Sequence, residues 1–300
     1  MNKIVVLGGD GVGPEVTAAA VRVLEAASSQ FKLGLEFENA LIGGAAYDAA
    51  GSPLPPATVA ACKASTAILL GAVGGPKWDT IEVSKRPEQG LLGIRKALGL
   101  FANLRPVTAV PELAAASPLK PEKLRGVDIL VIRELTGGIY FGKRNRTATA
   151  AFDTCEYSAG EIERVCRVAA KLAMGRRKKI TSVDKANVLD TSRLWRDVAT
   201  RVFRDEFPEL EVEHLLVDAA AMHLLSRPAD FDVMVTENMY RLYATIQNAG
   251  IKRVPLLADK DFALDADAVL KAIDAPGNDS TGSLAATVIT RLPEAGEPDR

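Results

Sequence analysis

The chain has 300 residues, of which 48% are hydrophobic and 25% are charged, as in ordinary globular proteins. Its 37 basic and 38 acidic residues nearly cancel, so no overall field favours nucleic acid or an anionic membrane as a partner. No apolar run in the sequence approaches the roughly 20 residues of a membrane-spanning helix. The length suits two domains or one large one.

The start of the chain and its cysteines predict a cytoplasmic location. MNKIVVLGGD leads directly into an expected strand and has none of the regions of a signal peptide. Cys62, Cys155 and Cys166 show no CxxC spacing, and such a sparse set favours a reducing compartment. The two histidines, His214 and His223, do not form a metal-ligand pattern.

Short apolar runs along the chain predict the strands of a largely parallel sheet. They are continuous rather than alternating, which is typical of strands buried on both faces. The Pro- and Ala-rich stretch 107–124 is the expected crossing between two domains. The apolar runs occupy residues 3–9, 66–75, 127–132, 178–183 and 231–238.

Helical periodicity separates these runs and completes an α/β pattern. Helices are predicted at 13–31, at 159–175 and at 191–207. Ser158 and Glu161 have the spacing of a capping box at the start of the second helix.

The glycine-rich segment LGGDGVGPEV follows a strand and opens a helix, so its backbone N–H groups could face an anion. Its glycines, at 8, 9, 11 and 13, do not fit GxGxxG, and no acidic residue follows at the distance of a ribose contact. A loop that supports a ligand and a purely structural turn are equally compatible with this pattern.

Three arginines stand in or beside apolar segments, where an unpaired charge would be costly. Arg95, Arg105 and Arg133 could converge on a substrate with two carboxylates, because planar guanidinium groups bind carboxylates bidentately. Structural ion pairs are the alternative. Tyr140 follows Arg133 closely in RELTGGIYFG, which would place a proton donor beside such an anion site.

Three further polar residues follow or interrupt apolar segments. Lys185 and Asn187 come just after a strand, and a lysine in cationic or apolar surroundings can act as a general base. Asp218 lies among apolar residues in LLVDAAAMHLL, where a carboxylate needs a cation, a metal or a helix N-terminus.

Long motifs between residue 1 and about residue 239 resemble the β-decarboxylating dehydrogenases, and in particular their 3-isopropylmalate dehydrogenase branch. The resemblance implies a two-domain α/β fold of the isopropylmalate/isocitrate dehydrogenase type with a mostly parallel sheet. Leu91 favours the isopropylmalate branch, in which a leucine receives the isopropyl group. The motifs are GDGVGPEV, LLGAVGGPKWD, RPEQGLLGIRKALGLFANLRP, RELTGGIYFG, SVDKANVL, VDAAAMHLL and FDVMVTENM.

This resemblance also implies domains and partners. Residues 1–100 would form part of a first, cofactor-side domain and residues 101–239 a second domain that binds substrate and forms a homodimer. Residues 240–300 would replace the rest of the first domain. The implied reaction is the NAD-dependent oxidative decarboxylation of 3-isopropylmalate in leucine biosynthesis, with Mg²⁺ or Mn²⁺ as the metal.

The family's functional residues map onto this sequence as follows. Tyr140 would be the general acid, and Lys185 the general base, which reaches in from the partner subunit together with Asp218. Asp218 would bind both the metal and the substrate. The other substrate-binding residues would be Leu91, Arg95, Arg105 and Arg133, and NAD would lie against Gly75, Pro76, Lys77, Glu88 and Asn187.

The family pattern stops after about residue 239. Leu242 and Ile246 stand where the family has two more metal-binding aspartates, and the loop that grips the adenosine of NAD is missing. The tail is similar instead to a segment of histidinol-phosphate aminotransferases, without their pyridoxal-binding lysine context. A working enzyme, an inactive relative that binds a dicarboxylate or dimerises, and an isocitrate-type enzyme are therefore the three hypotheses, and Leu91 argues against the last.

Overall fold

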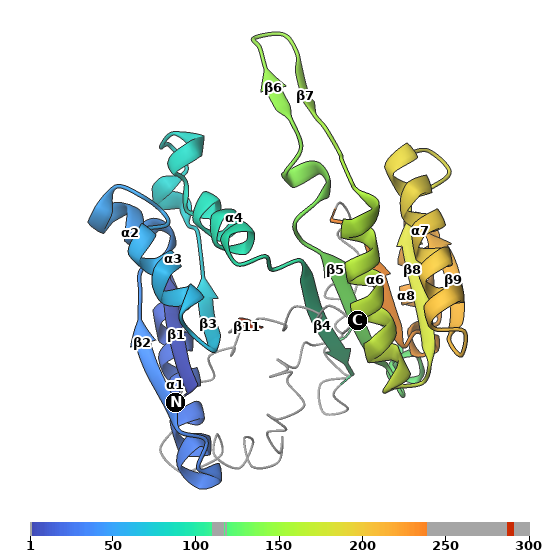
Figure 1. Ribbon diagram of the computed structural model, residues 1–300, viewed down its shortest axis with the longest axis horizontal. Coiled ribbons are helices and arrows are strands. Elements are labelled where there is room, and N and C mark those ends of the chain that lie inside the picture. Colours follow the sequence, from blue (N-terminus) through green and yellow to red (C-terminus); the bar gives the residue numbers. More distant parts are fainter. Residues whose placement is uncertain (1, 110–116, 118, 239–286, 291–300) are drawn as a thin grey trace, which may run out of the picture. The chain divides into compact units, whose positions relative to one another are not determined.

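The computed structural model describes residues 2–109, 117, 119–238 and the backbone of 287–290 (Figure 1). The chain divides between Leu100 and Phe101 into two compact units, and strand 287–290 belongs to the first. The expected crossing at 107–124 is therefore wrong: Val107 already pairs with Ile129 in the sheet of the second unit. The predicted segment 240–300 lies outside the described residues except for that strand.

The first unit is a four-stranded sheet with helices on both faces. β1 (Asn2–Gly9) pairs in parallel with β2 (Leu35–Asn39) and with β3 (Ala67–Ala72), and β11 (Thr287–Thr290) runs antiparallel to β3. The sheet is accompanied by α1 (Gly13–Phe31), α2 (Gly43–Ala50), α3 (Pro56–Lys63), η1 (Pro76–Trp78), η2 (Val83–Lys85) and α4 (Pro87–Ala97).

Successive residues of β1 enter two different cores. Ile4 and Val6 pack with residues of α1, whereas Val5 and Leu7 pack on the other face with Ile94 of α4. Both faces of the strand are therefore covered, which explains why its sequence is a continuous apolar run.

The second unit has a five-stranded sheet in the order β4-β5-β10-β8-β9. Four of its strands are parallel, and only the edge strand β4 runs antiparallel, beside β5. A separate two-stranded hairpin is formed by β6 (Arg144–Arg146) and β7 (Ala151–Asp153). The sheet strands are β4 (Ala102–Thr108), β5 (Asp128–Glu134), β8 (Lys179–Asp184), β9 (Glu211–Leu216) and β10 (Val233–Thr236).

Helices cover both faces of this sheet as well. One core holds Trp195 and Phe203 of α7 with Ile162 of α6, and the other holds Leu224 of α8 with Phe231. Figure 1 shows α6, α7 and α8 beside the strands of this unit. Its helices are α5 (Pro121–Leu124), η4 (Gly138–Tyr140), α6 (Ala159–Met174), α7 (Asp190–Glu206), α8 (Val217–Ser226) and η5 (Pro228–Asp230).

The α/β class and the mostly parallel sheet predicted from the sequence are confirmed. The predicted helices at 13–31, 159–175 and 191–207 are found as α1, α6 and α7, within one residue at each end. The capping box is also present, because the Ser158 hydroxyl accepts from the Glu161 N–H while the Glu161 carboxylate accepts from the Ser158 N–H.

Candidate functional site

The carboxyl ends of four parallel strands gather polar side chains at one edge of the second unit's sheet. Arg133 is near the end of β5, Asn238 follows β10, Lys185 follows β8 and Asp218 follows β9. Because these strands are parallel, their carboxyl ends meet at a single edge. That edge is where open α/β sheets bind ligands.

Arg133 and Tyr140 lie against each other at this edge. The guanidinium carbon of Arg133 is 5.6 Å from the centroid of the Tyr140 ring, a separation at which a cation attracts an aromatic face. Arg133 Nε also donates to Asn238 Oδ1 at 3.1 Å. The Tyr140 side chain is exposed, so its phenol can meet a bound molecule.

Close packing explains why glycine occupies two positions between Arg133 and Tyr140. A Cβ on Gly138, whose φ is +73°, would lie 2.7 Å from the Tyr157 hydroxyl. Buried Glu134 fixes the start of the turn, because its carboxylate accepts from the N–H groups of Thr136 and Gly137, each at 2.8 Å. The turn thus brings the phenol of Tyr140 back toward Arg133.

Arg105 shares a sheet face with Arg133. On β4 it lies opposite Val131, while Asn103 lies opposite Arg133, and directly paired residues of antiparallel strands point to the same side. Arg105 Nε donates to Asn103 Oδ1. The antiparallel edge strand therefore places two of the predicted carboxylate-binding arginines on one face of the second unit.

Lys185 and Asp218 form the second pair at this edge, because Lys185 Nζ makes an ion pair with the carboxylate of Asp218. Asp218 is 71% exposed and stands in the first turn of α8, where a negative charge suits the helix dipole. Buried Asp184 holds the lysine's loop by accepting from the Ala186 N–H and from Arg196. Asn187 is exposed on the same loop.

The remaining predicted site residues belong to the first unit. Glu88, Leu91 and Arg95 have helical spacing on α4 and form one stripe. The Glu88 carboxylate lies against Gly74, where an added Cβ would be 2.9 Å from Oε1. Gly75 and Pro76 begin η1, and the Lys77 ammonium pairs with Asp48 at 2.6 Å.

The first glycine-rich segment forms a tight turn whose glycines are required by close packing against neighbouring backbone. A Cβ on Gly9 would overlap the carbonyl oxygen of Ala72, and a Cβ on Gly13 would overlap that of Gly8. Asp10, which is buried, accepts from the N–H groups of Gly44, Ala45 and Gly74 at 2.7–2.9 Å.

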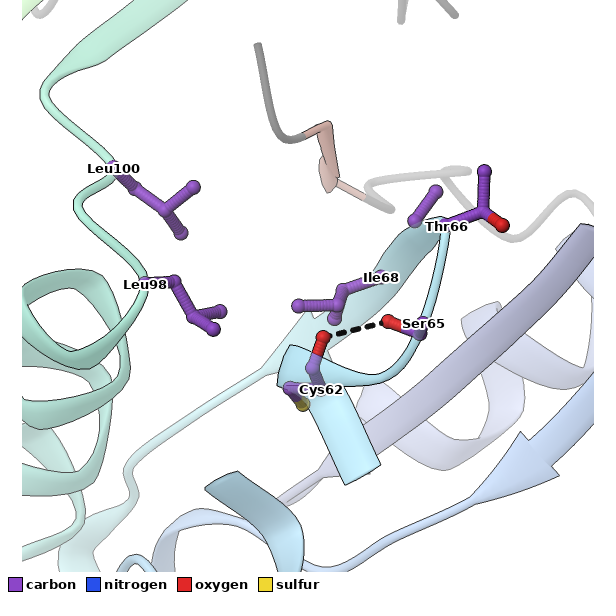
Figure 2. A pocket seen from close by; sticks show the side chains of 7 residues that line it. Cys62, Ser65, Thr66, Ile68, Leu98 and Leu100 are labelled. Carbon is purple, nitrogen blue, oxygen red and sulfur yellow. Dashed lines mark hydrogen bonds between the residues drawn. The ribbon is translucent and has the colours of Figure 1, made fainter. Parts of the chain in front are cut away.

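A small pocket of the first unit lies away from these residues (Figure 2). It is lined by apolar side chains including Ile68, Leu98 and Leu100, at the amino end of β3, whereas Gly75 follows the carboxyl end of that strand. Burial raises the pKa of the Cys62 thiol in this pocket to about 11, and Glu38 adds to the shift. Cys62 is therefore a neutral thiol, unsuited to nucleophilic chemistry.

Within the described ranges, no group of three or more His, Cys, Asp or Glu side chains has the arrangement of a metal site. Leu242 and Ile246, expected at the family's other metal-binding positions, lie outside those ranges. The same part of the chain contains no helix both long and apolar enough to span a membrane.

Three residues at the sheet edge were not found from the sequence. Asn238 contacts Arg133, and Tyr157 packs against the glycine turn. Buried Glu237 follows β10, the strand that lies between β5 and β8 in the sheet. The polar pair Glu237–Asn238 directly after an apolar run was the available signal, because such residues sit at the carboxyl edge of a parallel sheet.

This fold is that of a dehydrogenase family. The chain belongs to the isocitrate/isopropylmalate dehydrogenases, whose family model matches residues 3–241. Among curated relatives, the 3-isopropylmalate dehydrogenase of Anaeromyxobacter dehalogenans is 57% identical over 243 residues, which cover 79% of this chain and 69% of the relative. The 3-isopropylmalate dehydrogenase of Priestia megaterium is 56% identical over 244 residues, which cover 80% of this chain and 66% of the relative. The resemblance inferred from the motifs is confirmed.

Solved structures agree with this assignment. Isocitrate dehydrogenase from Methylococcus capsulatus has a TM-score of 0.70 at 30% identity, covering 84% of this chain and 71% of that one. A β-decarboxylating dehydrogenase from Thermococcus kodakarensis has a TM-score of 0.65 at 29% identity, covering 83% and 68%. The chain thus spans about two thirds of the length of its relatives.

Proposed function

We propose that this chain is an oxidoreductase that carries out the NAD-dependent oxidative decarboxylation of 3-isopropylmalate to 2-oxoisocaproate, a step of leucine biosynthesis. The observation that carries the proposal is the high identity to proteins named 3-isopropylmalate dehydrogenase over about four fifths of the chain. Leu91, on the same stripe of α4 as Arg95, supports the choice of a substrate with an apolar branch.

The chain's own residues have distinct roles in this proposal. Arg95, Arg105 and Arg133 bind the two carboxylates, and Arg133 keeps the Tyr140 phenol beside the substrate. Lys185 takes the proton of the substrate hydroxyl, and Tyr140 protonates the carbon left by CO₂. Each of these proton transfers needs a group within hydrogen-bond reach of the substrate.

NAD and a divalent cation complete the proposed site. Gly75, Pro76, Lys77, Glu88 and Asn187 are the residues proposed to border NAD, and Asp218 is proposed to bind Mg²⁺ or Mn²⁺ together with the substrate. The exposed Asp218 carboxylate fits an oxygen-seeking cation, although the cation must share it with Lys185. When bound, NAD accepts the hydride and the cation stabilises negative charge on the substrate oxygen.

The second unit is also proposed to form a homodimer. Asp218, Met222 and Leu225 have helical spacing on α8, and both apolar side chains are exposed, Met222 to 70%. An exposed apolar stripe is typical of a surface that another protein covers. A partner that covers this helix would lie next to the proposed metal-binding aspartate.

An inactive relative that binds a dicarboxylate or dimerises is the alternative function. The observation behind it is that the family match ends at residue 241, before the positions of Leu242 and Ile246. The identity to proteins named 3-isopropylmalate dehydrogenase gives this alternative no better support than turnover.

One assay separates these functions. The unmodified chain is incubated with NAD, Mn²⁺ and 3-isopropylmalate, and NADH is followed by its absorbance. NADH formation that requires all three components supports the proposal, and isocitrate in place of isopropylmalate is the control for the other branch of the family. Binding of isopropylmalate without NADH formation would support the inactive relative instead.

A further inference from the structure

Both polar groups of the Asn238 side chain make hydrogen bonds within the second unit. Its Oδ1 accepts from Arg133 Nε at 3.1 Å, and its Nδ2 donates to the Gly137 carbonyl at 2.9 Å. Its backbone N–H donates to the Tyr157 hydroxyl at 2.7 Å. The residue is only 2% exposed, so these partners replace water around it.

The contact with Arg133 determines which side of the guanidinium can meet a ligand. A guanidinium can hold a carboxylate either across Nε and one terminal nitrogen or across the two terminal nitrogens. Since Asn238 already accepts from Nε, the first arrangement would require breaking that hydrogen bond. The second arrangement, end-on across the terminal nitrogens, leaves it intact.

The contact with Gly137 acts on the turn that carries Tyr140. Gly137 precedes η4, and Tyr140 is the last residue of that short helix. Tyr157 packs against Gly137 and Gly138 from the other side, where an added Cβ would come within 2.8 Å of its ring or hydroxyl. Asn238 and Tyr157 therefore both hold the glycine turn that leads from Arg133 to Tyr140.

We propose that Asn238 is a positioning residue that orients Arg133 for end-on binding of a substrate carboxylate and fixes the turn that presents Tyr140. The inference rests on the proposed function, because it assumes that Arg133 binds a dicarboxylate. Asn238 is buried and both polar groups of its side chain are occupied. Since the turn acts on proton delivery by Tyr140, we expect the effect of Asn238 on substrate binding to pass through Arg133.

A double-mutant cycle tests this coupling. Calorimetry measures the binding of 3-isopropylmalate, in the presence of Mn²⁺, to the full chain and to Asn238→Ala, Arg133→Ala and the double variant. We expect Asn238→Ala to weaken binding about three- to tenfold, the range expected for one hydrogen bond. In the Arg133→Ala background the same change should have less than about a twofold effect, because residues that act through each other are not additive.

Ser182→Ala is the matched control. The Ser182 hydroxyl is buried in the same sheet and accepts from Trp195 Nε1 at 3.1 Å, so its removal also leaves a buried donor without its partner. It should lower stability without changing the affinity for isopropylmalate. Asn238→Leu, which keeps about the size of the side chain but removes both of its polar groups, provides a second variant should the alanine variant not fold. It should weaken binding as much as Asn238→Ala does.

The outcomes are distinct. If the unmodified chain does not bind isopropylmalate, the proposed function fails and this inference fails with it. If the unmodified chain binds but both Asn238 variants bind equally well, only the positioning role is overturned. An undiminished effect of Asn238→Ala in the Arg133→Ala background would also overturn it, since the effect would not pass through Arg133.

Discussion

Glu237 follows β10, and its side chain is fully buried. Burial raises the pKa of Glu237 to about 7; the Ser192 side chain opposes this shift, and the nearby carboxylate of Asp184 adds to it. At neutral pH the group is therefore close to half protonated, next to the residue that holds Arg133.

This raised pKa makes stability depend on pH. The folded state keeps a proton that the unfolded state releases, so the free energy of unfolding should fall as the pH rises from about 4.5 to about 7. Glu237→Gln removes this fall and should gain up to about 3 kcal/mol relative to the unmodified chain between pH 5 and pH 8. Urea unfolding at a series of pH values measures the difference.

Glu163→Gln is the control, because it should change the pH dependence of the free energy of unfolding in the opposite direction. Hydrogen bonding to Arg201 and the charge of Arg167 lower the pKa of Glu163, so its contribution to stability is lost as the pH falls, not as it rises. Identical pH dependence in the unmodified chain and in Glu237→Gln would contradict the prediction for the buried acid.

The proposed role of Lys185 as general base can be tested by substitution. Lys185→Met should lower NADH formation by about 10²–10⁴-fold, the usual contribution of a general base, while isopropylmalate still binds. Lys179→Met is the matched control on the same strand, because Lys179 also forms an ion pair, with Glu211 at 3.2 Å. Equal losses in the two variants would remove Lys185 from the role of base.

At the level of elements, the capping box of α6 is the feature with the clearest energetic consequence. Ser158→Ala removes the side-chain acceptor for the Glu161 N–H and should lower the free energy of unfolding by about 1 kcal/mol. Urea unfolding would measure this loss. Ser84→Ala, at an exposed serine in η2, is expected to change stability much less.

The helices were predictable because their signals are local. Ser158 and Glu161 identify the start of α6, and Trp195, Val198 and Val202 mark one face of α7. β4 was missed because Asn103 and Arg105 interrupt its apolar pattern, and its strand character comes from pairing with β5.

The residues of the candidate site also differ in whether their sequence signals are local. Arg133 and Tyr140 are seven positions apart, and a glycine turn between them was enough to predict an anion site with a proton donor. The contact of Arg133 with Asn238 spans 105 residues and exists because β10 pairs with β5. Sheet order of this kind is not readable from periodicity, which explains why the contact between Asn238 and Arg133 was not expected.

For the whole molecule, the exposed stripe of α8 makes oligomeric state a direct test. Met222→Lys with Leu225→Lys places two charges on this stripe and should convert a dimer to a monomer, because charges are depleted from the cores of protein interfaces. Sedimentation at micromolar concentration would measure the mass. Val83→Lys, at an exposed apolar position in the first unit, is the control. A monomeric unmodified chain would contradict the proposed dimer.

Asp10 has a consequence for the motion of the first unit. One carboxylate accepts from the N–H groups of Gly44 and Ala45 at the start of α2 and from that of Gly74 after β3, so two segments distant in sequence share one acceptor. Opening one of these segments lowers the stability of the closed conformation of the other. Their amide protons should therefore exchange with deuterium at one common rate, and Asp10→Asn should accelerate all three together. The two loops at the carboxyl edge of this sheet would then open and close as a single unit.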